Sequence, residues 1–346
     1  MKAIHFTIVG CGRIAQRHAE HIVKVGQLVA VCDIVEQRAR DLASKYSCAF
    51  FKQLEDMLVH LQEGSVVSIC TPNCLHANQT IVSLNSGMHV ICEKPMAIHS
   101  LDCDQMIKAA KNSKKNLFIV KQNRFNPPII ALKRVIEEGR LGRIINVQLN
   151  CFWNRTNDYY LTSDWKGKVL YDGGTLYTQF SHFIDLVNWL VGDISRVFAI
   201  TGNLMHQNIV EFEDTGVVAL EFANGALGTI NYTVNSHKKN MEGSITIFGE
   251  TGTVKVGGQY LNILEYQSIE GYEISGIPQS RPANEYGFYQ GSMSNHDKVY
   301  QNVIDVLNGR TEIATTAEEG KKTVEIIEKI YSAARQSRTR AKRSVK

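Results

Sequence analysis

The chain has 346 residues, and this length makes two domains the natural expectation. Its hydrophobic fraction of 44% and its charged fraction of 21% are ordinary for a soluble globular protein. The net charge is +4, but residues 335–346 carry six basic side chains, without which the charge is −2. We expect this basic tail to be solvated and disordered, although a nucleic-acid or membrane arm would have the same composition.

The sequence shows no sign of a membrane or secretory protein. No apolar run reaches the roughly 18 residues that a membrane-spanning helix needs, and Met1 leads directly into a strand, so we expect no secretory signal. The eight cysteines lack regular spacing, and several lie in or beside apolar strands, which indicates free thiols in a reducing cytoplasm. Cys70 and Cys74 have no second pair to complete a zinc site, so we expect no metal.

The first part of the chain alternates short apolar runs with helical patterns, which indicates an α/β domain with a doubly wound parallel sheet. Strands are predicted at residues 4–9, 28–32, 50–51, 66–70, 88–92 and 117–121. Helices are predicted at residues 15–25, 36–46, 54–61, 77–86 and 101–112. We place this nucleotide-binding domain at residues 1–122.

The pattern changes after residue 122, and we expect a second, substrate-binding domain at residues 123–334. A helix is predicted to start at Pro127-Pro128 and end near Gly139. Strands are predicted at residues 144–152, 197–201, 217–222, 227–234, 244–248, 253–256 and 260–266. Their Gly and Asn turns indicate one open, mostly antiparallel sheet. The closing helices at residues 295–308 and 317–334 could pack back on the first domain.

The segment 10–15, with the sequence GCGRIA, follows the first predicted strand and opens a helix. In this pattern Gly10 permits a tight turn, Gly12 lets the backbone approach a pyrophosphate, and Ala15 lets the helix pack on the strand. The N–H groups at the start of the helix then face the phosphates. Asp33 ends the second strand, where a carboxylate accepts ribose hydroxyls and repels a 2′-phosphate. The pattern therefore predicts NAD rather than NADP.

A loop that follows the strand at 66–70 is also expected to contact the cofactor. Pro72 takes the chain out of the sheet, between Thr71 and Asn73, so this loop should lie over the dinucleotide. His76 lies just beyond it and is either a cofactor contact or a helix-capping histidine.

Lys94 lies between Glu93 and Pro95, directly after the strand at 88–92. The carboxyl ends of the strands are where a doubly wound sheet binds its ligands, so we predict that Lys94 acts on the substrate. Pro95 restricts the backbone of Lys94, and a strained or cis Lys94–Pro95 peptide would aim the side chain. Partial burial would lower the pKa of the ammonium and allow proton transfer near neutrality.

A second candidate site lies in residues 172–185. Gly173-Gly174 predicts a turn into a helix. Thr178, His182 and Asp185 have the spacing of one helical face beside an apolar stripe. This polar row predicts a helix that lines a cleft, with His182 as a catalytic residue, although a structural histidine would show the same spacing.

A polar and aromatic loop precedes this helix and is expected to determine specificity. It contains Arg155, Tyr159 and Trp165, and the tryptophan could instead pack between domains. Arg155 or Arg124 could pair bidentately with a carboxylate or phosphate of the substrate.

Over nearly its whole length the chain resembles the glucose–fructose oxidoreductase / inositol dehydrogenase (Gfo/Idh/MocA) family. The likeness rests on the glycine loop, Cys70-Thr71-Pro72-Asn73, Glu93-Lys94-Pro95, Asn123-Arg124-Phe125 and the Gly-Gly…His…Asp helix. The resemblance implies a Rossmann domain and an α/β domain whose open sheet face forms homodimers or homotetramers. It also implies that Lys94 and His182 flank the reacting carbon.

One departure from the family concerns the histidine helix. The family usually has Asp four residues before the histidine and Gly two before it, whereas this chain has Thr178 and Phe180. In this respect the segments 120–127, 172–185 and 295–300 resemble the UDP-N-acetylglucosaminuronate 3-dehydrogenases of bacterial O-antigen synthesis. This likeness implies oxidation of C3 of a nucleotide sugar, with Lys94 or His182 as the base.

Motifs and resemblance together imply two sets of binding residues. The cofactor set is Gly10, Gly12, Arg13, Ile14, Asp33, Thr71, Pro72, Asn73, His76, Glu93, Lys94, Gln122 and Trp165. The substrate set is Lys94, Asn123, Arg124, Arg155, Tyr159, Thr178, Gln179 and His182. Within it, Gln179, Asn123 and Arg155 would hold the acetamido, uronate or diphosphate groups.

Three other functions fit parts of the same sequence. A glycosidase could use bound NAD for transient oxidation at C3, and a polyol dehydrogenase could act on a free inositol. An NAD-binding regulator could use the basic tail to reach acidic partners. The sequence leaves open whether NADH is released or reoxidised in place by a 2-oxo acid. We expect no nucleic-acid or membrane partner.

Overall fold

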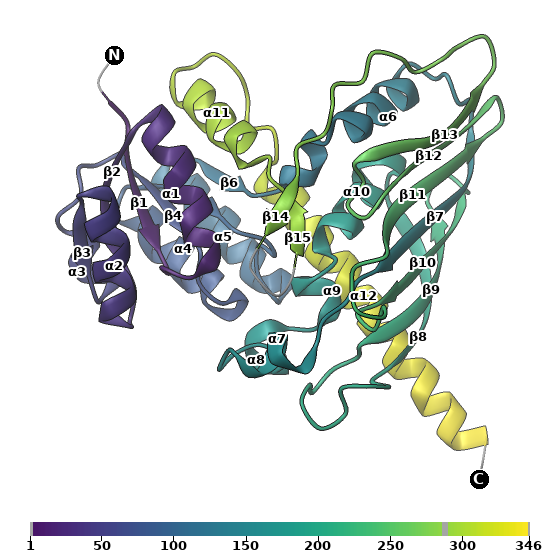
Figure 1. Ribbon diagram of the computed structural model, residues 1–346, viewed down its shortest axis with the longest axis horizontal. Helices are drawn as coiled ribbons and strands as arrows, with labels where there is room; N and C mark the ends of the chain where they lie inside the picture. The colour runs from purple at the N-terminus through teal and green to yellow at the C-terminus, as the bar shows by residue number, and fades with distance from the viewer. Residues whose placement is uncertain (1–2, 286–289, 345–346) are drawn as a thin grey trace. The chain divides into compact units, whose positions relative to one another are not determined.

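The structure, a computed structural model, describes residues 3–285 and 290–344 (Figure 1). It divides into two compact units. Unit 1 contains the chain up to Lys121 together with His296–Val324, and unit 2 contains Gln122–Asn295 and the chain from Glu325 onward. Gln122, which the sequence analysis placed in the first domain, therefore belongs to unit 2.

Among the described residues, the core of unit 1 is a six-stranded parallel sheet, as expected for a doubly wound domain. Its order is β3-β2-β1-β4-β5-β6. The strands are β1 (His5–Val9), β2 (Gln27–Cys32), β3 (Ala49–Phe51), β4 (Val66–Ile69), β5 (His89–Cys92) and β6 (Leu117–Ile119). The strand order reverses between β1 and β4, so the carboxyl ends of these strands form the switch point where such sheets bind nucleotides.

The helices of unit 1 follow the strands in alternation. They are α1 (Arg13–Val25), α2 (Glu36–Tyr46), α3 (Leu54–Leu58), α4 (His76–Asn85), α5 (Ser100–Ser113) and, after a long excursion of the chain, α11 (His296–Leu307). Their apolar faces bury strand residues such as Phe6, Ile8 and Val67, which have no exposed surface. This double coverage explains why the strands are almost continuously apolar.

Unit 2 is built on a larger sheet with the order β13-β12-β11-β7-β10-β9-β8. Its strands are β7 (Ile144–Phe152), β8 (Ile194–Gly202), β9 (Thr215–Phe222), β10 (Leu227–Thr233), β11 (Glu242–Gly249), β12 (Gly252–Gly257) and β13 (Ile263–Ile269). The pairing is antiparallel except between β7 and β10, which confirms the expected open, mostly antiparallel sheet. A separate antiparallel pair, β14 (Ala283–Glu285) and β15 (Gln290–Met293), was not predicted.

The helices of unit 2 are shorter and more interrupted than predicted. They are α6 (Pro127–Glu137), α7 (Asn157–Leu161), α8 (Val169–Asp172), α9 (Thr175–Thr178) and α10 (Ser181–Val191). The expected single helix with Thr178, His182 and Asp185 on one face is wrong, because α9 and α10 are separate. At the break, the side chain of Gln179 is held by hydrogen bonds and Phe180 packs on aromatic rings.

One face of the unit 2 sheet is covered by helices and the other is open (Figure 1). On the covered face, Phe180 packs against Tyr232 of β10, with ring centroids 6.0 Å apart. On the opposite face, Ile200 pairs with Val217 across β8 and β9. These two side chains are 74% and 56% exposed, so an apolar surface lies on the open face.

The last helix, α12 (Ala317–Ser344), corrects the expectation of a disordered tail from residue 335. After Gly320 the helix contains neither Gly nor Pro, so nothing in the sequence interrupts it. Arg338 also donates to the carbonyl of Thr201 at 2.8 Å. Residues 345 and 346 of the predicted tail lie outside the described residues. Within the described chain, we find no helix with both the length and the apolar character needed to cross a membrane.

Candidate active site

The glycine loop has the geometry that a dinucleotide site requires. Gly10 has a φ of +88°, and a Cβ there would lie 2.8 Å from the backbone of Cys70, so only glycine fits. Gly12 precedes α1, and a Cβ there would meet no atom within 4 Å. The free space lies where the first N–H groups of α1 lack helical partners, which is the place where we expect a pyrophosphate. Arg13 and Ile14 form the first turn, exposed and half-buried respectively.

Asp33 has a structural role that the sequence did not reveal. Its carboxylate accepts the N–H of Cys11 at 2.7 Å and the N–H of Val35 at 2.8 Å, and only 8% of the residue is exposed. A carboxylate has about four acceptor positions, so ribose hydroxyls can still bind. Asp33 thus stabilises the glycine loop through Cys11, and it does so at the place where we expect the adenosine ribose.

His76 joins the loops that follow β4 and β5. Its Nδ1 lies 2.7 Å from the carbonyl oxygen of Pro95, and its Nε2 lies 2.9 Å from that of Thr71. Burial lowers the pKa of the ring, against the opposing effect of the two carbonyls. The side chain is 1% exposed, so the structure favours a positioning role over a direct cofactor contact. Pro72 and Asn73 lie in the chain between Thr71 and His76, and Asn73 is buried at the start of a short 3₁₀ turn.

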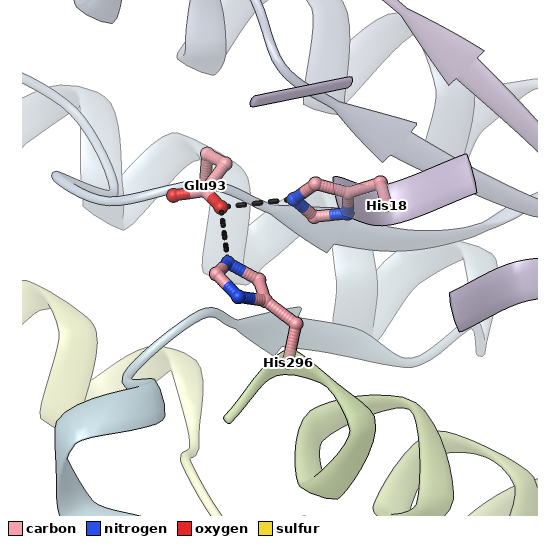
Figure 2. A group of neighbouring side chains, drawn as sticks. All are labelled: His18, Glu93 and His296. Carbon is pink, nitrogen blue, oxygen red and sulfur yellow. Dashed lines mark hydrogen bonds and ion pairs between the residues drawn. The ribbon is translucent and has the colours of Figure 1, made fainter. Parts of the chain in front are cut away.

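Lys94 is half-buried, and its peptide bond to Pro95 is cis, as expected. Its backbone N–H donates to Oε2 of Glu93 at 3.0 Å. The other oxygen of Glu93, Oε1, contacts His18 at 2.9 Å and His296 at 3.3 Å (Figure 2). Both Glu93 oxygens therefore accept hydrogen bonds from the protein, which favours a positioning role over the predicted cofactor contact.

In unit 2, three residues of the predicted substrate set form one buried group. Arg155 Nε donates to Oε1 of Gln179 at 2.6 Å, and Nε2 of Gln179 donates to the hydroxyl of Tyr159 at 2.8 Å. The guanidinium of Arg155 also lies over the ring of Tyr159, with 5.2 Å from Cζ to the centroid. All three are no more than 5% exposed. The structure thus brings these residues together beside α10.

Thr178 stands where the family usually has Asp, and a carboxylate contacts it from another helix. The hydroxyl of Thr178 donates to Oδ1 of Asp172, at the end of α8. The second oxygen of Asp172 accepts the N–H of Gly167 at 2.8 Å, and the residue is 1% exposed. The chain therefore keeps a buried carboxylate near this position by a different route.

Arg124 pairs with Asp185 rather than presenting its guanidinium to a ligand. Nε donates to Oδ2 at 2.7 Å and a terminal nitrogen donates to Oδ1 at 2.8 Å. Both side chains are almost completely buried. Because His182 is on the same helix, three residues before Asp185, this geometry favours Arg124 as a residue that positions α10. His182 itself is 2% exposed, in the first turn of the helix.

Asn123 is the residue whose surroundings most clearly call for a ligand. It is 1% exposed, and both polar atoms of its amide lack a hydrogen-bond partner among the described residues. The side chain of the neighbouring Gln122 donates from Nε2 to the hydroxyl of Ser292 at 3.2 Å. The Oε1 atom of Gln122 has no hydrogen-bond partner among the described residues. Buried amides are normally satisfied, so these atoms fit polar groups of a bound molecule. Trp165 lies half-buried in the loop between α7 and α8.

Sequence reasoning gave no role to several residues that support these groups. They are His18, His296 and Tyr300 in unit 1, and Asn240, Tyr260 and Gln290 in unit 2. The only sequence signal was the family likeness at residues 295–300. Lys94 and Glu93 lie in unit 1 and His182 in unit 2, so their joint action on one substrate stays a prediction.

Comparison with known families identifies the fold. Residues 4–121 match the family described as oxidoreductases with an NAD-binding Rossmann fold, and residues 133–342 match the C-terminal alpha/beta domain of the same oxidoreductases. The chain belongs to the Gfo/Idh/MocA family. This confirms the family resemblance and the NAD-binding Rossmann domain that the sequence indicated. The residue sets for binding and catalysis stay predictions.

Among solved structures, this Gfo/Idh/MocA chain is similar to the WlbA dehydrogenase from Bordetella pertussis in complex with NADH and UDP-GlcNAcA. The two are 36% identical, the match covers 97% of this chain and 96% of WlbA, and the TM-score is 0.89. Curated relatives include levoglucosan dehydrogenase of Pseudarthrobacter phenanthrenivorans and inositol 2-dehydrogenase of Salmonella paratyphi B, each 28% identical. The matches span 55% and 66% of this chain, and 54% and 66% of the relatives' own lengths.

Proposed function

We propose that the protein oxidises the C3 hydroxyl of UDP-N-acetylglucosaminuronic acid to a ketone, with NAD as the acceptor, during synthesis of a bacterial surface polysaccharide such as O-antigen. The main support is its 36% identity, over nearly the full length of both chains, to a dehydrogenase crystallised with NADH and UDP-GlcNAcA. The curated sugar and inositol dehydrogenases give weaker support, because they match only about half to two thirds of their lengths.

The residues of unit 1 fit NAD. The open space at Gly12 and the start of α1 would hold the pyrophosphate, and Asp33 would accept the adenosine ribose hydroxyls. NAD, when bound, supplies the hydride acceptor. A carboxylate at the ribose position repels a 2′-phosphate, which supports NAD over NADP.

Lys94 and His182 handle the proton in this proposal. Oxidation of an alcohol removes a hydride from carbon and a proton from oxygen, so one group must accept that proton while another orients the hydroxyl. A lysine and a histidine can each do either task. Asn123 and the group of Arg155, Gln179 and Tyr159 would hold polar groups of the sugar and diphosphate, and their binding energy would orient C3.

The first experiment mixes purified protein with NAD and a panel of UDP-sugars and follows absorbance of reduced nicotinamide. The panel includes UDP-GlcNAcA, UDP-GlcNAc, UDP-glucuronic acid and free myo-inositol. We expect reduction with UDP-GlcNAcA and a mass loss of two hydrogens in the product. Activity on inositol alone contradicts the proposal and favours a polyol dehydrogenase. Hexosamine release without net NADH indicates a glycosidase, and NAD binding without turnover of any sugar indicates a regulator.

A slow or absent NADH signal in the first experiment needs one further arm. Adding 2-oxoglutarate distinguishes reoxidation of bound NADH from lack of activity, because the ketosugar then accumulates without net reduction.

Two variants test the catalytic pair. Lys94→Met and His182→Asn should each lower kcat by about 100-fold or more while NAD still binds, because a positioned acid or base contributes about that factor. Lys108→Met and His237→Asn remove the same side-chain types from exposed positions and serve as controls. Full turnover in either site variant would remove that residue from the mechanism.

The proposal includes a homo-oligomer formed through the open face of the unit 2 sheet. The exposed, cross-strand pair Ile200 and Val217 supports it, together with Phe198, which is 56% exposed on the same strand as Ile200. Light scattering after size-exclusion chromatography should give the mass of a dimer or tetramer. The Ile200→Asp and Val217→Asp variants should shift that mass towards the monomer.

All eight cysteines are free, and six of them are buried. Burial raises the pKa of thiols such as Cys70 and Cys92, so they stay protonated and unreactive. This arrangement supports a reducing compartment, and we place the enzyme in the cytoplasm, where UDP-sugars are made available as substrates. Thiol titration of protein isolated under alkylating conditions should find all eight reduced.

A further inference from the structure

We propose that His18, His296 and Tyr300 form a buried positioning group that acts on Lys94 through the carboxylate of Glu93. His18 lies on α1, Glu93 directly follows β5, and His296 and Tyr300 both lie on α11. Figure 2 shows His18, Glu93 and His296. Oε1 of Glu93 lies 2.9 Å from Nε2 of His18 and 3.3 Å from Nε2 of His296. Oε2 of Glu93 accepts the backbone N–H of Lys94 at 3.0 Å.

The hydrogen bonds of this group can run in only one direction. Glu93 as a carboxylate only accepts, so both histidines must present an Nε2–H to it. A neutral His18 then has a bare Nδ1, which accepts the hydroxyl of Tyr300 at 2.7 Å. The oxygen of Tyr300 in turn lies 3.0 Å from Oγ of Ser68 on β4, which is left to donate. One ordered chain therefore runs from Ser68 to the backbone of Lys94.

The protonation states agree with this order. Burial lowers the pKa of His18, which keeps the ring neutral. Burial alone would raise the pKa of Glu93, but the hydrogen bonds from His18 and His296 hold it well below its usual range. The result is a buried carboxylate next to the residue that carries the ammonium. A fixed negative charge at that place favours one orientation of the Lys94 loop.

His18, Glu93 and His296 also have the composition of a metal site, since their possible ligand atoms lie within 4.8 Å of one another. The geometry fits hydrogen bonds better. Both ring nitrogens approach a single oxygen of Glu93, which is the arrangement of two donors on one carboxylate. All three residues are also buried, and each histidine nitrogen that faces Glu93 is already at hydrogen-bond distance from it.

The group connects the two halves of the proposed site in unit 1. His18 lies on α1, whose first turn follows Gly12, and Glu93 directly precedes Lys94. The carboxylate of Glu93 therefore links α1, which begins at the proposed pyrophosphate site, to the segment that carries Lys94. This inference rests on the proposed role of Lys94, and its test includes a measurement that needs no sugar.

The test compares Tyr300→Phe, His18→Gln and His18→Leu with Ser83→Ala. Tyr300→Phe removes one hydroxyl and keeps the ring, which packs edge-on against Phe6 at 5.6 Å. His18→Gln retains an N–H that can reach Glu93, whereas His18→Leu does not. Ser83→Ala is the control, because it removes a buried hydroxyl that donates to the carbonyl of Gln79 at 2.7 Å within the same helix, α4.

We expect kcat to fall about 10-fold in Tyr300→Phe and more in His18→Leu, at nearly constant KM for NAD, since one hydrogen bond corresponds to about one factor of ten. His18→Gln should recover part of the loss. Acylation of Lys94, followed by mass spectrometry across pH without sugar, should show a shifted midpoint in His18→Leu and none in Ser83→Ala.

Three results would overturn the positioning group. One is an unchanged acylation midpoint in His18→Leu. Another is a loss of kcat no greater than that of Ser83→Ala at equal thermal stability. The third is stoichiometric zinc in the purified protein that is lost in His18→Leu. Because acylation and zinc analysis need no sugar, the first and third outcomes can be measured even if the proposed sugar oxidation fails.

Discussion

Arg124 and Asp185 make a bidentate ion pair inside unit 2, with N–O distances of 2.7 and 2.8 Å. The pair joins the 3₁₀ turn η2 (Gln122–Phe125) to α10, the helix that begins at Ser181. The guanidinium also lies 5.0 Å from the ring centroid of Trp189, one turn further along that helix. The start of α10, with His182, is therefore fixed against the segment that contains the unsatisfied amide of Asn123.

Arg124→Lys should weaken both the fold and the reaction. Lysine keeps the charge but cannot form two parallel hydrogen bonds, so the free energy of unfolding should fall by about 2 kcal/mol. The kcat of the folded protein should also fall, because α10, which carries His182, would no longer be held in one position. Denaturant unfolding and kcat measure the two effects. Arg134→Lys, on the exposed face of α6, is the control and should behave like the parent protein. Equal kcat in the two variants would contradict the role in positioning.

Gly174→Ala should be strongly destabilising. Gly174 has a φ of +140°, and a Cβ there would lie 2.8 Å from Cζ of Tyr331. Gly192→Ala is a close control, since its φ is +107° and a Cβ would meet nothing within 4 Å. Both variants strain the backbone, but only the first also overpacks, which costs about 1–3 kcal/mol more. Thermal unfolding measures the difference, and equal losses would show that Tyr331 moves aside freely.

Asp33→Asn should narrow the preference for NAD over NADP. The amide removes the charge that repels a 2′-phosphate, and its NH₂ group cannot accept both N–H groups that Asp33 now accepts. We expect kcat/KM for NAD to fall about 10-fold, the factor that 1.4 kcal/mol represents, while that for NADP rises or stays constant. The exposed change Asp41→Asn on α2 should leave the ratio unaltered. An unchanged ratio in Asp33→Asn would place the adenosine ribose elsewhere.

Glu213 should make the stability of unit 2 depend on pH. Burial raises its pKa from 4.5 to about 7, although hydroxyls of Tyr331 and Tyr232 that donate to it act in the opposite direction. Because the folded-state pKa is the higher one, folding takes up a proton between about pH 4.5 and 7. This stabilising contribution is complete below that range and is lost as the pH rises through it, by about 3 kcal/mol in all.

The Glu213→Gln variant checks this dependence by thermal unfolding at pH 5 and pH 8. It should match the parent protein at pH 5 and exceed it at pH 8, because glutamine imitates the protonated acid. Glu221→Gln, at a partly exposed site on β9, is the control. A variant less stable than the parent at both pH values would mean that Glu213 is charged in the folded protein.

Local motifs could be interpreted from the sequence because each contains its own physical reason. Gly10 must be glycine for its backbone conformation, and Lys94 is placed by the strand before it and the proline after it. The alternation of strands and helices likewise indicated the parallel, doubly wound sheet of unit 1. None of these features depends on a distant partner.

The supporting contacts could not be predicted, since their members are far apart along the chain. Glu93 is 75 residues from His18 and 203 from His296, and Arg124 is 61 residues from Asp185. In the sequence, Arg124 suggested an anionic ligand. Only the fold reveals that its guanidinium is paired with a carboxylate of the protein, that of Asp185. The basic tail shows the same limit, because its charge composition suggested a solvated end and could not reveal the contact of Arg338 with the carbonyl of Thr201.

The composition of unit 1 from two separate stretches has a consequence for synthesis of the chain. His296 and Tyr300 emerge from the ribosome well over a hundred residues after Lys121, so the nascent Rossmann sheet forms before His18 and Glu93 can contact their partners on α11. A fragment ending at Lys121 would carry that defect permanently. Recombinant expression of the nucleotide-binding half alone should therefore graft α11 onto it.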